Sequence, residues 1–219
     1  MKYRIMRKSC RYKINWVGLR KLKERVLPLD KKEIIVQSAI HLFQHKGIEQ
    51  TTVSDIVKQS RIAQGTFYLY FPSKLSLMPA IAEEMVKVLV KRMREKISES
   101  MTIDEQMENI IESIFSINEE YSEVLAMIYS GLASTEHLKE WETVYAPCYE
   151  LISNLLEEAI GMGTIQSSIQ PHRTAKLIIG LVESAAEQVY LYNHSDEKEI
   201  ENQKEAVTQF LFDSLHIKK

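Results

Sequence analysis

The chain has 219 residues, of which 45% are hydrophobic and 26% charged. This length can bury a sizeable core, and the balance argues against a disordered chain. Seven glycines and five prolines are too few for the many turns of an all-β fold, so the composition favours helices. Cys10 and Cys148 lie far apart, which argues against a disulfide framework or zinc finger and fits a reducing cytoplasm. No apolar run approaches the roughly 18 residues of a membrane span.

The net charge of -2 hides an asymmetry along the chain. Residues 1–28 hold ten Lys or Arg and one acid, whereas the remainder carries a net charge of -11. An anionic partner is therefore expected to meet the N-terminal end. For residues 1–28 themselves, three interpretations stay open: a disordered arm that touches DNA, a membrane-surface segment, or an upstream extension without a role.

The first predicted helix covers residues 31–46. Asp30 is expected to cap the start of the helix, and Gly47 is expected to end it. One apolar stripe at helical spacing consists of Ile35, Ala39, Leu42 and Phe43. Because this stripe must pack on something, further helices should follow.

Two short helices are predicted next. Thr52 and Asp55 resemble a capping box with Asp in place of the usual Glu or Gln, and open a helix to Gln59. Residues 60–62 interrupt it, and 63–70 restart as a second short helix. Two short helices joined by about three residues form the helix-turn-helix pattern.

The rest of the chain predicts longer helices with few breaks. Ser73 is expected to cap a helix over 74–100 that Pro79 bends from inside, and Thr102 with Glu105 forms a capping box. The remaining predicted helices are about 103–120, 122–130, 135–160 with a kink at Pro147, 171–192 beginning at Pro171, and 195–217.

The second short helix has two chemically different sides. Phe67 and Phe71, four residues apart, mark the buried side, and Gly65 lies nearly opposite. Tyr68 and Tyr70 occupy the flanks, where core packing and contact with another molecule are both open interpretations. Glycine lets a backbone approach a partner closely, and phenol groups can donate to phosphate.

Residues 35–77, about one fifth of the chain, resemble the TetR family of bacterial regulators. The resemblance lies in an ordered set of signals: Phe43 and Gly47, Thr51-Thr52, Ile56, then Gly65-Thr66-Phe67-Tyr68-x-Tyr70-Phe71 and Lys74. It implies an all-α protein in which an N-terminal three-helix bundle with a helix-turn-helix joins a larger helical ligand-binding and dimerisation domain. The expected division is 1–28 as the basic extension, 29–78 as the DNA-binding domain and 79–219 as the effector-binding and dimerisation domain.

The resemblance implies roles for individual residues. Gln64 and Thr66 would face the major groove, Gln64 being suited to an adenine edge. The full set of expected DNA contacts is Thr52, Arg61, Gln64, Gly65, Thr66, Tyr68, Tyr70 and Lys74.

Two positions depart from the usual pattern. Arg61 stands where a glycine is common and costs about 1 kcal/mol if it is left-handed, unless it gains a phosphate contact. Ala63 replaces a capping Ser or Thr, at a cost of about 1 kcal/mol.

The helical body is expected to hold an apolar effector pocket, as the resemblance implies, although core packing is the competing interpretation for each residue. The candidates are Met85, Met107, Phe115, Tyr121, Met127, Trp141, Tyr145 and Tyr149. The last two helices are rich in small and branched residues, which favours a homodimer on an inverted-repeat operator.

These observations predict a cytoplasmic transcriptional regulator, most simply a repressor that a small, mainly apolar effector releases from its operator. The competing hypothesis is a nucleoid-binding or scaffold protein of the same fold without an effector. The sequence offers no nucleophile–base spacing, phosphate loop or metal cluster, so we expect no enzyme, cofactor, metal or membrane partner.

Overall fold

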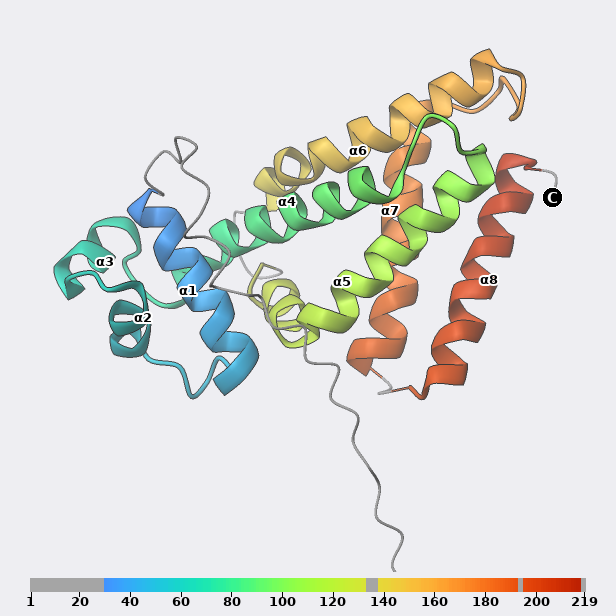
Figure 1. The fold of residues 1–219 in the computed structure, drawn as a ribbon. Helices are drawn as coiled ribbons and strands as arrows, with labels where there is room; N and C mark the ends of the chain where they lie inside the picture. The colour runs from blue at the N-terminus through green and yellow to red at the C-terminus, as the bar shows by residue number, and fades with distance from the viewer. Residues whose placement is uncertain (1–29, 133–137, 193–194, 218–219) are drawn as a thin grey trace, which may run out of the picture.

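The computed structural model describes residues 30–132, 138–192 and 195–217, with backbone only for 129–132 and 138–141. The basic segment 1–28 lies outside the described residues. Throughout the described ranges the regular elements are helices, which confirms the predicted fold class (Figure 1). They are α1 (Lys31–Lys46), α2 (Val53–Ser60), α3 (Gln64–Tyr70), a 3-10 turn (Leu75–Leu77), α4 (Met78–Lys96), α5 (Ile103–Leu132), α6 (Leu138–Gly161), α7 (Pro171–Glu187), a π-helical turn (Gln188–Tyr192) and α8 (Glu197–Leu215).

Helices α1, α2 and α3 form a head at one end of the molecule (Figure 1). Asp30 caps α1 by accepting from the Lys32 amide, and Gly47 ends the helix at φ 78°. The buried stripe of α1 packs in one hydrophobic core with Ile56 of α2 and Phe67 of α3. Both of these residues are 0% exposed. The predicted first helix and its caps are therefore confirmed.

The prediction of one helix over 74–100 with Pro79 inside it is wrong. A 3-10 turn over Leu75–Leu77 comes first, and its Ser76 amide donates to the Ser73 hydroxyl at 3.2 Å. Helix α4 then begins at Met78, so Pro79 stands in its first turn, where no amide donor is needed. The proline starts the helix instead of bending it.

Helix α5 contains the break that the sequence predicts between two helices. The chain runs as one helix from Ile103 to Leu132, but Tyr121 has non-helical angles of φ -119° and ψ 22°. At the start of α5 the Thr102 amide donates to the Glu105 carboxylate at 2.9 Å. Pro147 lies inside α6, as predicted. The predicted start of that helix at Thr135 lies outside the described residues.

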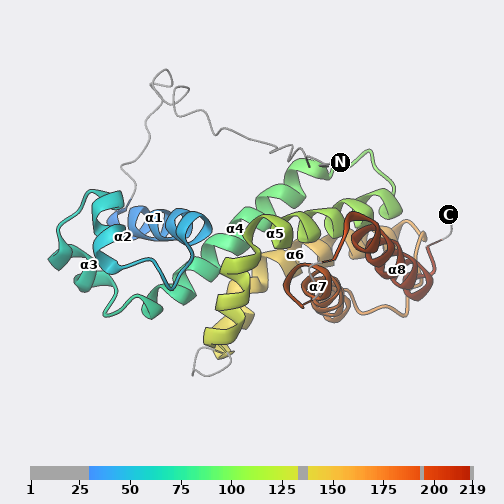
Figure 2. The same ribbon diagram turned by 90° about the horizontal axis from the view of Figure 1, so that it is seen from below.

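Helices α7 and α8 lie at the end of the molecule away from α3 (Figure 2). Pro171 stands in the first turn of α7, and the last five residues of the predicted helix form the π-helical turn. Asp196 caps α8 by accepting from the Glu199 amide, and the helix begins at Glu197, two residues after the predicted start. Within the described ranges, none of the helices combines the length and apolarity that crossing a bilayer requires.

Candidate DNA-binding helix and internal cavity

The start of α2 is fixed by the predicted capping box. The Asp55 amide donates to the Thr52 hydroxyl at 3.1 Å, and the Thr52 amide donates to the Asp55 carboxylate at 2.9 Å. Lys46 adds an ion pair to the same carboxylate at 2.7 Å. The hydrogen bond from Lys46, together with those from Thr52, holds the pKa of the Asp55 carboxyl group well below its usual range. The end of α1 is thereby joined to the start of α2.

The turn between α2 and α3 has the two departures that the sequence indicates. Arg61 adopts the left-handed conformation, at φ 54° and ψ 40°, and its side chain is exposed. Ala63 is the N-cap residue of α3 and provides no side-chain hydrogen bond. The fold therefore tolerates a left-handed residue at Arg61 and the absence of a side-chain cap at the start of α3.

Helix α3 buries one side and exposes the other, as predicted. Phe67 and Phe71 are 0% and 4% exposed, with ring centroids 5.9 Å apart. Tyr68 and Tyr70 are 48% and 40% exposed, so their phenol groups are available to a partner. Of the two interpretations open for these tyrosines, core packing is the one that the structure does not support.

Gly65 has no structural reason within the protein to be glycine. A Cβ atom built at this position meets nothing within 4 Å, and its φ lies outside the left-handed region. The residue is exposed, next to the exposed Gln64 and the partly buried Thr66. The glycine therefore leaves the α3 backbone open to close approach from outside.

Lys74 has a role inside the fold that sequence reasoning missed. Its ammonium group donates to the carbonyl oxygens of Ile48 and Thr51 at 2.7 and 2.8 Å. These bonds fasten the loop between α1 and α2 to the segment after α3. A lysine ammonium has three donors, so a phosphate contact by the same group stays a prediction.

Leu69 is the exposed residue of α3 that the expected contact set omits. It is 85% exposed, although leucine gains free energy when its surface leaves water. Its position opposite the buried phenylalanines was the available signal, since an apolar side chain there can meet a thymine methyl group.

The predicted effector residues do not form one site. Met85 and Tyr145 line a small cavity of about 20 Å³ between α4, α5, α6 and α7. Tyr149 lies beside it, with its ring centroid 6.0 Å from that of Tyr145. Met107 and Phe115 are fully buried in the core away from the cavity lining, and Phe115 packs edge-on against Tyr190.

The other three candidates have different positions. Tyr121 lies at the kink of α5, and burial raises its pKa to about 12. Met127 is partly buried against the core. The side chain of Trp141 lies outside the described part of the structure.

Two polar residues of the cavity were missed by sequence reasoning. Asn118 on α5 is 2% exposed, and Glu183 on α7 accepts a hydrogen bond from the Tyr145 hydroxyl at 2.7 Å. Glu183 as a residue keeps partial exposure, yet burial of its carboxyl group raises its pKa to about 7. Burial, with Glu183 as a second cause, also raises the pKa of Cys148 to about 12.

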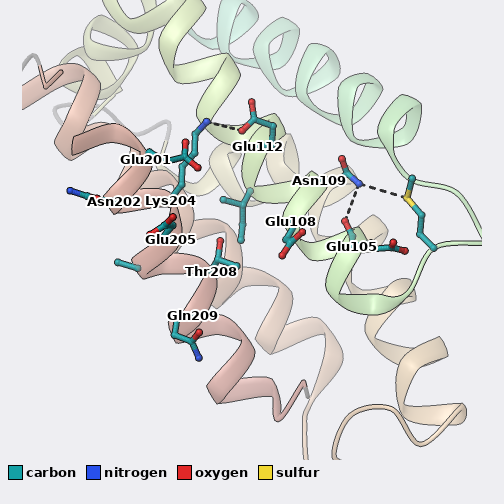
Figure 3. Close-up of a pocket in the computed structure, with 13 residues that line it drawn as sticks. Glu105, Glu108, Asn109, Glu112, Glu201, Asn202, Lys204, Glu205, Thr208 and Gln209 are labelled. Carbon is teal, nitrogen blue, oxygen red and sulfur yellow. Dashed lines mark hydrogen bonds and ion pairs between the residues drawn. The ribbon is translucent and has the colours of Figure 1, made fainter. Parts of the chain in front are cut away.

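A wide acidic groove lies between α5 and α8 (Figure 3). Its volume is about 1000 Å³, and five glutamates line it: Glu105, Glu108, Glu112, Glu201 and Glu205. Its one lysine, Lys204, pairs with Glu112 at 2.7 Å. This surface would repel DNA phosphates, which leaves the head as the better DNA-binding end.

Comparison with known proteins decides the family. Residues 35–81 match the model of "Bacterial regulatory proteins, tetR family", and residues 107–215 match the "Tetracyclin repressor-like, C-terminal domain". The chain is 36% identical over 185 residues to the "Uncharacterized HTH-type transcriptional regulator YvdT" of Bacillus subtilis, covering 84% of this chain and 95% of that protein. The chain belongs to the TetR family. It is a DNA-binding transcriptional regulator.

Solved TetR-family structures share the fold. FadR from Bacillus subtilis, in complex with stearoyl-CoA, has a TM-score of 0.63 at 22% identity, over 81% of this chain and 96% of that one. FadR from Thermus thermophilus, a repressor in complex with lauroyl-CoA, has a TM-score of 0.67 at 16% identity, over 86% of this chain and 96% of that one.

Proposed function

We propose that this TetR-family protein is a dimeric cytoplasmic repressor that leaves an inverted-repeat operator when a small, mainly apolar effector enters its helical body. Residues 29–78 would form the DNA-binding domain, and residues 79–219 would bind the effector and dimerise. The observation that carries the proposal is the outward side of α3, where Gly65 has no packing role and both phenols are exposed.

The outward side of α3 would lie in the major groove of the operator. Gln64 and Thr66 would contact base edges, while Gly65 would let the helix backbone come close. We add Leu69, whose exposed methyl groups suit a thymine methyl. The proposed contacts to phosphates are Thr52, Arg61, Tyr68, Tyr70 and Lys74.

Dimerisation would use the exposed sides of α7 and α8. Leu177 on α7 and Phe210 on α8 are 73% and 60% exposed, although both are large and apolar. Gly180 is also exposed, and a Cβ there would meet nothing within 4 Å, so another helix could approach closely. A four-helix interface about a two-fold axis would cover these residues and place two α3 helices on one duplex.

Two contacts would pass a change in the body to the head. Gln37 of α1 donates to the Glu84 carboxylate of α4 at 2.9 Å, and Gln44 of α1 donates to the Glu120 carbonyl at 3.3 Å. Glu120 directly precedes the kink of α5, whose neighbouring turns line the cavity. An effector that fits better when these helices have shifted would lower the DNA-binding population.

The experiment begins by selecting an operator from a random duplex library with the purified protein. Fluorescence anisotropy then measures the affinity for that duplex with and without apolar ligands, including stearoyl-CoA and lauroyl-CoA because FadR relatives carry them. We expect recovery of an inverted repeat and release by at least one apolar ligand, with thermal stabilisation of the free protein. Binding without sequence preference, and without stabilisation by any ligand, would favour the nucleoid-binding or scaffold alternative.

A further inference from the structure

The internal cavity places hydrogen-bond acceptors on an otherwise apolar wall. Asn118 donates through Nδ2 to the Ile114 carbonyl at 3.0 Å, and the opposite amide orientation would set two oxygens against each other. The remaining atom, Oδ1, is a buried side-chain acceptor without a hydrogen-bond partner in the described part of the chain. Such an atom is costly unless something donates to it.

The second acceptor is the carboxyl group of Glu183 across the cavity. The Tyr145 hydroxyl already donates its proton to Oε1 of Glu183, so the phenol adds no further donor. Among the described lysines and arginines, none lies within ion-pair distance of this carboxyl group. Within the described part of the chain, the two acceptors therefore face the cavity without a matching cation.

Among the described side chains that act on the Glu183 carboxyl group, none adds positive charge. Glu187 on the same helix is a second acid, and Cys148 and Tyr149 of α6 have raised pKa values, each to about 12, so they stay neutral near pH 7. The lining residues from α4 are apolar, and the polar one from α5 is Asn118. A bound cation would recover the free energy that burial of the carboxylate costs.

We propose that the effector is an amphipathic amine, whose ammonium group binds between Asn118 Oδ1 and the Glu183 carboxylate while its hydrocarbon chain packs among the cavity's apolar side chains. This inference rests on the proposed effector-controlled function and narrows it to one head-group chemistry. An ammonium group supplies donors and positive charge, and both acceptors need one or the other. A carboxylate head would repel Glu183 and leave Asn118 Oδ1 unpaired.

The cavity must widen to admit such a chain. About 20 Å³ is room for one water molecule, whereas a hydrocarbon chain needs more. Met85 in the wall is adaptable, and Asn118 lies one turn before the kink of α5 at Tyr121. Widening at Asn118 would shift the nearby Glu120 carbonyl, which accepts a hydrogen bond from Gln44 of α1. The shift would thereby reach the head.

The test uses full-length protein on its selected operator and three probes with one chain length: n-octylammonium, n-octanol and octanoate. DNA release is followed by anisotropy, and binding to free protein by calorimetry. We expect n-octylammonium to bind the parent tightest and to release DNA. Glu183→Gln should weaken n-octylammonium binding about tenfold, because the negative charge opposite the ammonium group is lost, and should leave n-octanol binding within about twofold. Asn118→Leu should also weaken n-octylammonium binding about tenfold, because the ammonium group loses a hydrogen-bond acceptor.

Glu187→Gln is the matched control, since it removes the neighbouring charge on α7 without touching the cavity lining. Tighter binding of octanoate or stearoyl-CoA than of n-octylammonium would overturn the head-group assignment while leaving the effector-controlled function in place. Equal weakening by Glu187→Gln and Glu183→Gln would also overturn it, because a diffuse charge effect would then suffice. If none of the three probes binds or releases DNA while another apolar ligand does, the head-group assignment fails and the effector-controlled function stands.

Discussion

Replacing Gly65 with alanine separates what the fold requires at α3 from what DNA requires. The new Cβ atom would meet nothing within 4 Å. Alanine in a helix interior is more stable than glycine by about 1 kcal/mol, and in the first turn of so short a helix we expect about half of that. For a chain of this size, about 0.5 kcal/mol raises Tm by about 1–2 °C.

The same substitution should weaken DNA binding. A methyl group on the side proposed to face the groove would hold the helix away from the bases, and loss of one good base contact costs about 1–3 kcal/mol, or about 5- to 150-fold in Kd. Thermal unfolding and anisotropy on the selected operator measure the two effects. Gly161→Ala is the control, because its Cβ also meets nothing within 4 Å and it lies at the end of α6. Unchanged or tighter DNA binding by Gly65→Ala would refute the reasoning.

Three further predictions concern the dimer, the cavity and the head. Leu177→Asp should give a monomer in sedimentation at concentrations where the parent and the similarly exposed Leu75→Asp are dimers; a dimeric Leu177→Asp would contradict the interface. Burial raises the pKa of Glu183 from 4.5 to about 7, so the folded protein holds an extra proton between these values and its stability falls as pH rises through them. Urea titrations between pH 4.5 and pH 7 should show that the stability of Glu183→Gln lacks this fall with pH. An equal fall in the parent and the variant would rule out Glu183 as its cause. Lys74→Met should lower the free energy of unfolding by about 1–3 kcal/mol, because two carbonyl acceptors lose their donor, and an unshifted urea midpoint would disprove that role.

Local signals predicted the head because its elements are specified by neighbours in sequence. Thr52 and Asp55 are three residues apart, and their reciprocal hydrogen bonds need nothing from the rest of the fold. The spacing of Phe67 and Phe71 likewise identified the buried side of α3. Pro79 shows the limit of such signals. Its effect depends on whether a helix has already begun, and the 3-10 turn before it leaves no separate signature.

Interactions between distant residues could not be predicted in this way. Lys74 looks like a surface charge until the fold brings it to the Ile48 carbonyl, 26 residues away. Glu183 looks like a solvated residue on an amphipathic helix, yet its hydroxyl partner Tyr145 lies 38 residues earlier. For the same reason, the soft and aromatic residues of the body identified a core but only two residues of the cavity lining.

The most direct measurement compares operator affinity of a Tyr68→Phe, Tyr70→Phe double variant with that of Tyr192→Phe, since Tyr192 is 70% exposed in the π-helical turn that follows α7. Removing the two hydroxyl groups that we propose as phosphate donors should raise Kd about tenfold or more without changing the unfolding transition, whereas Tyr192→Phe should bind as the parent does. If the double variant binds its operator as tightly as the parent, the outward side of α3 is not the DNA-binding surface.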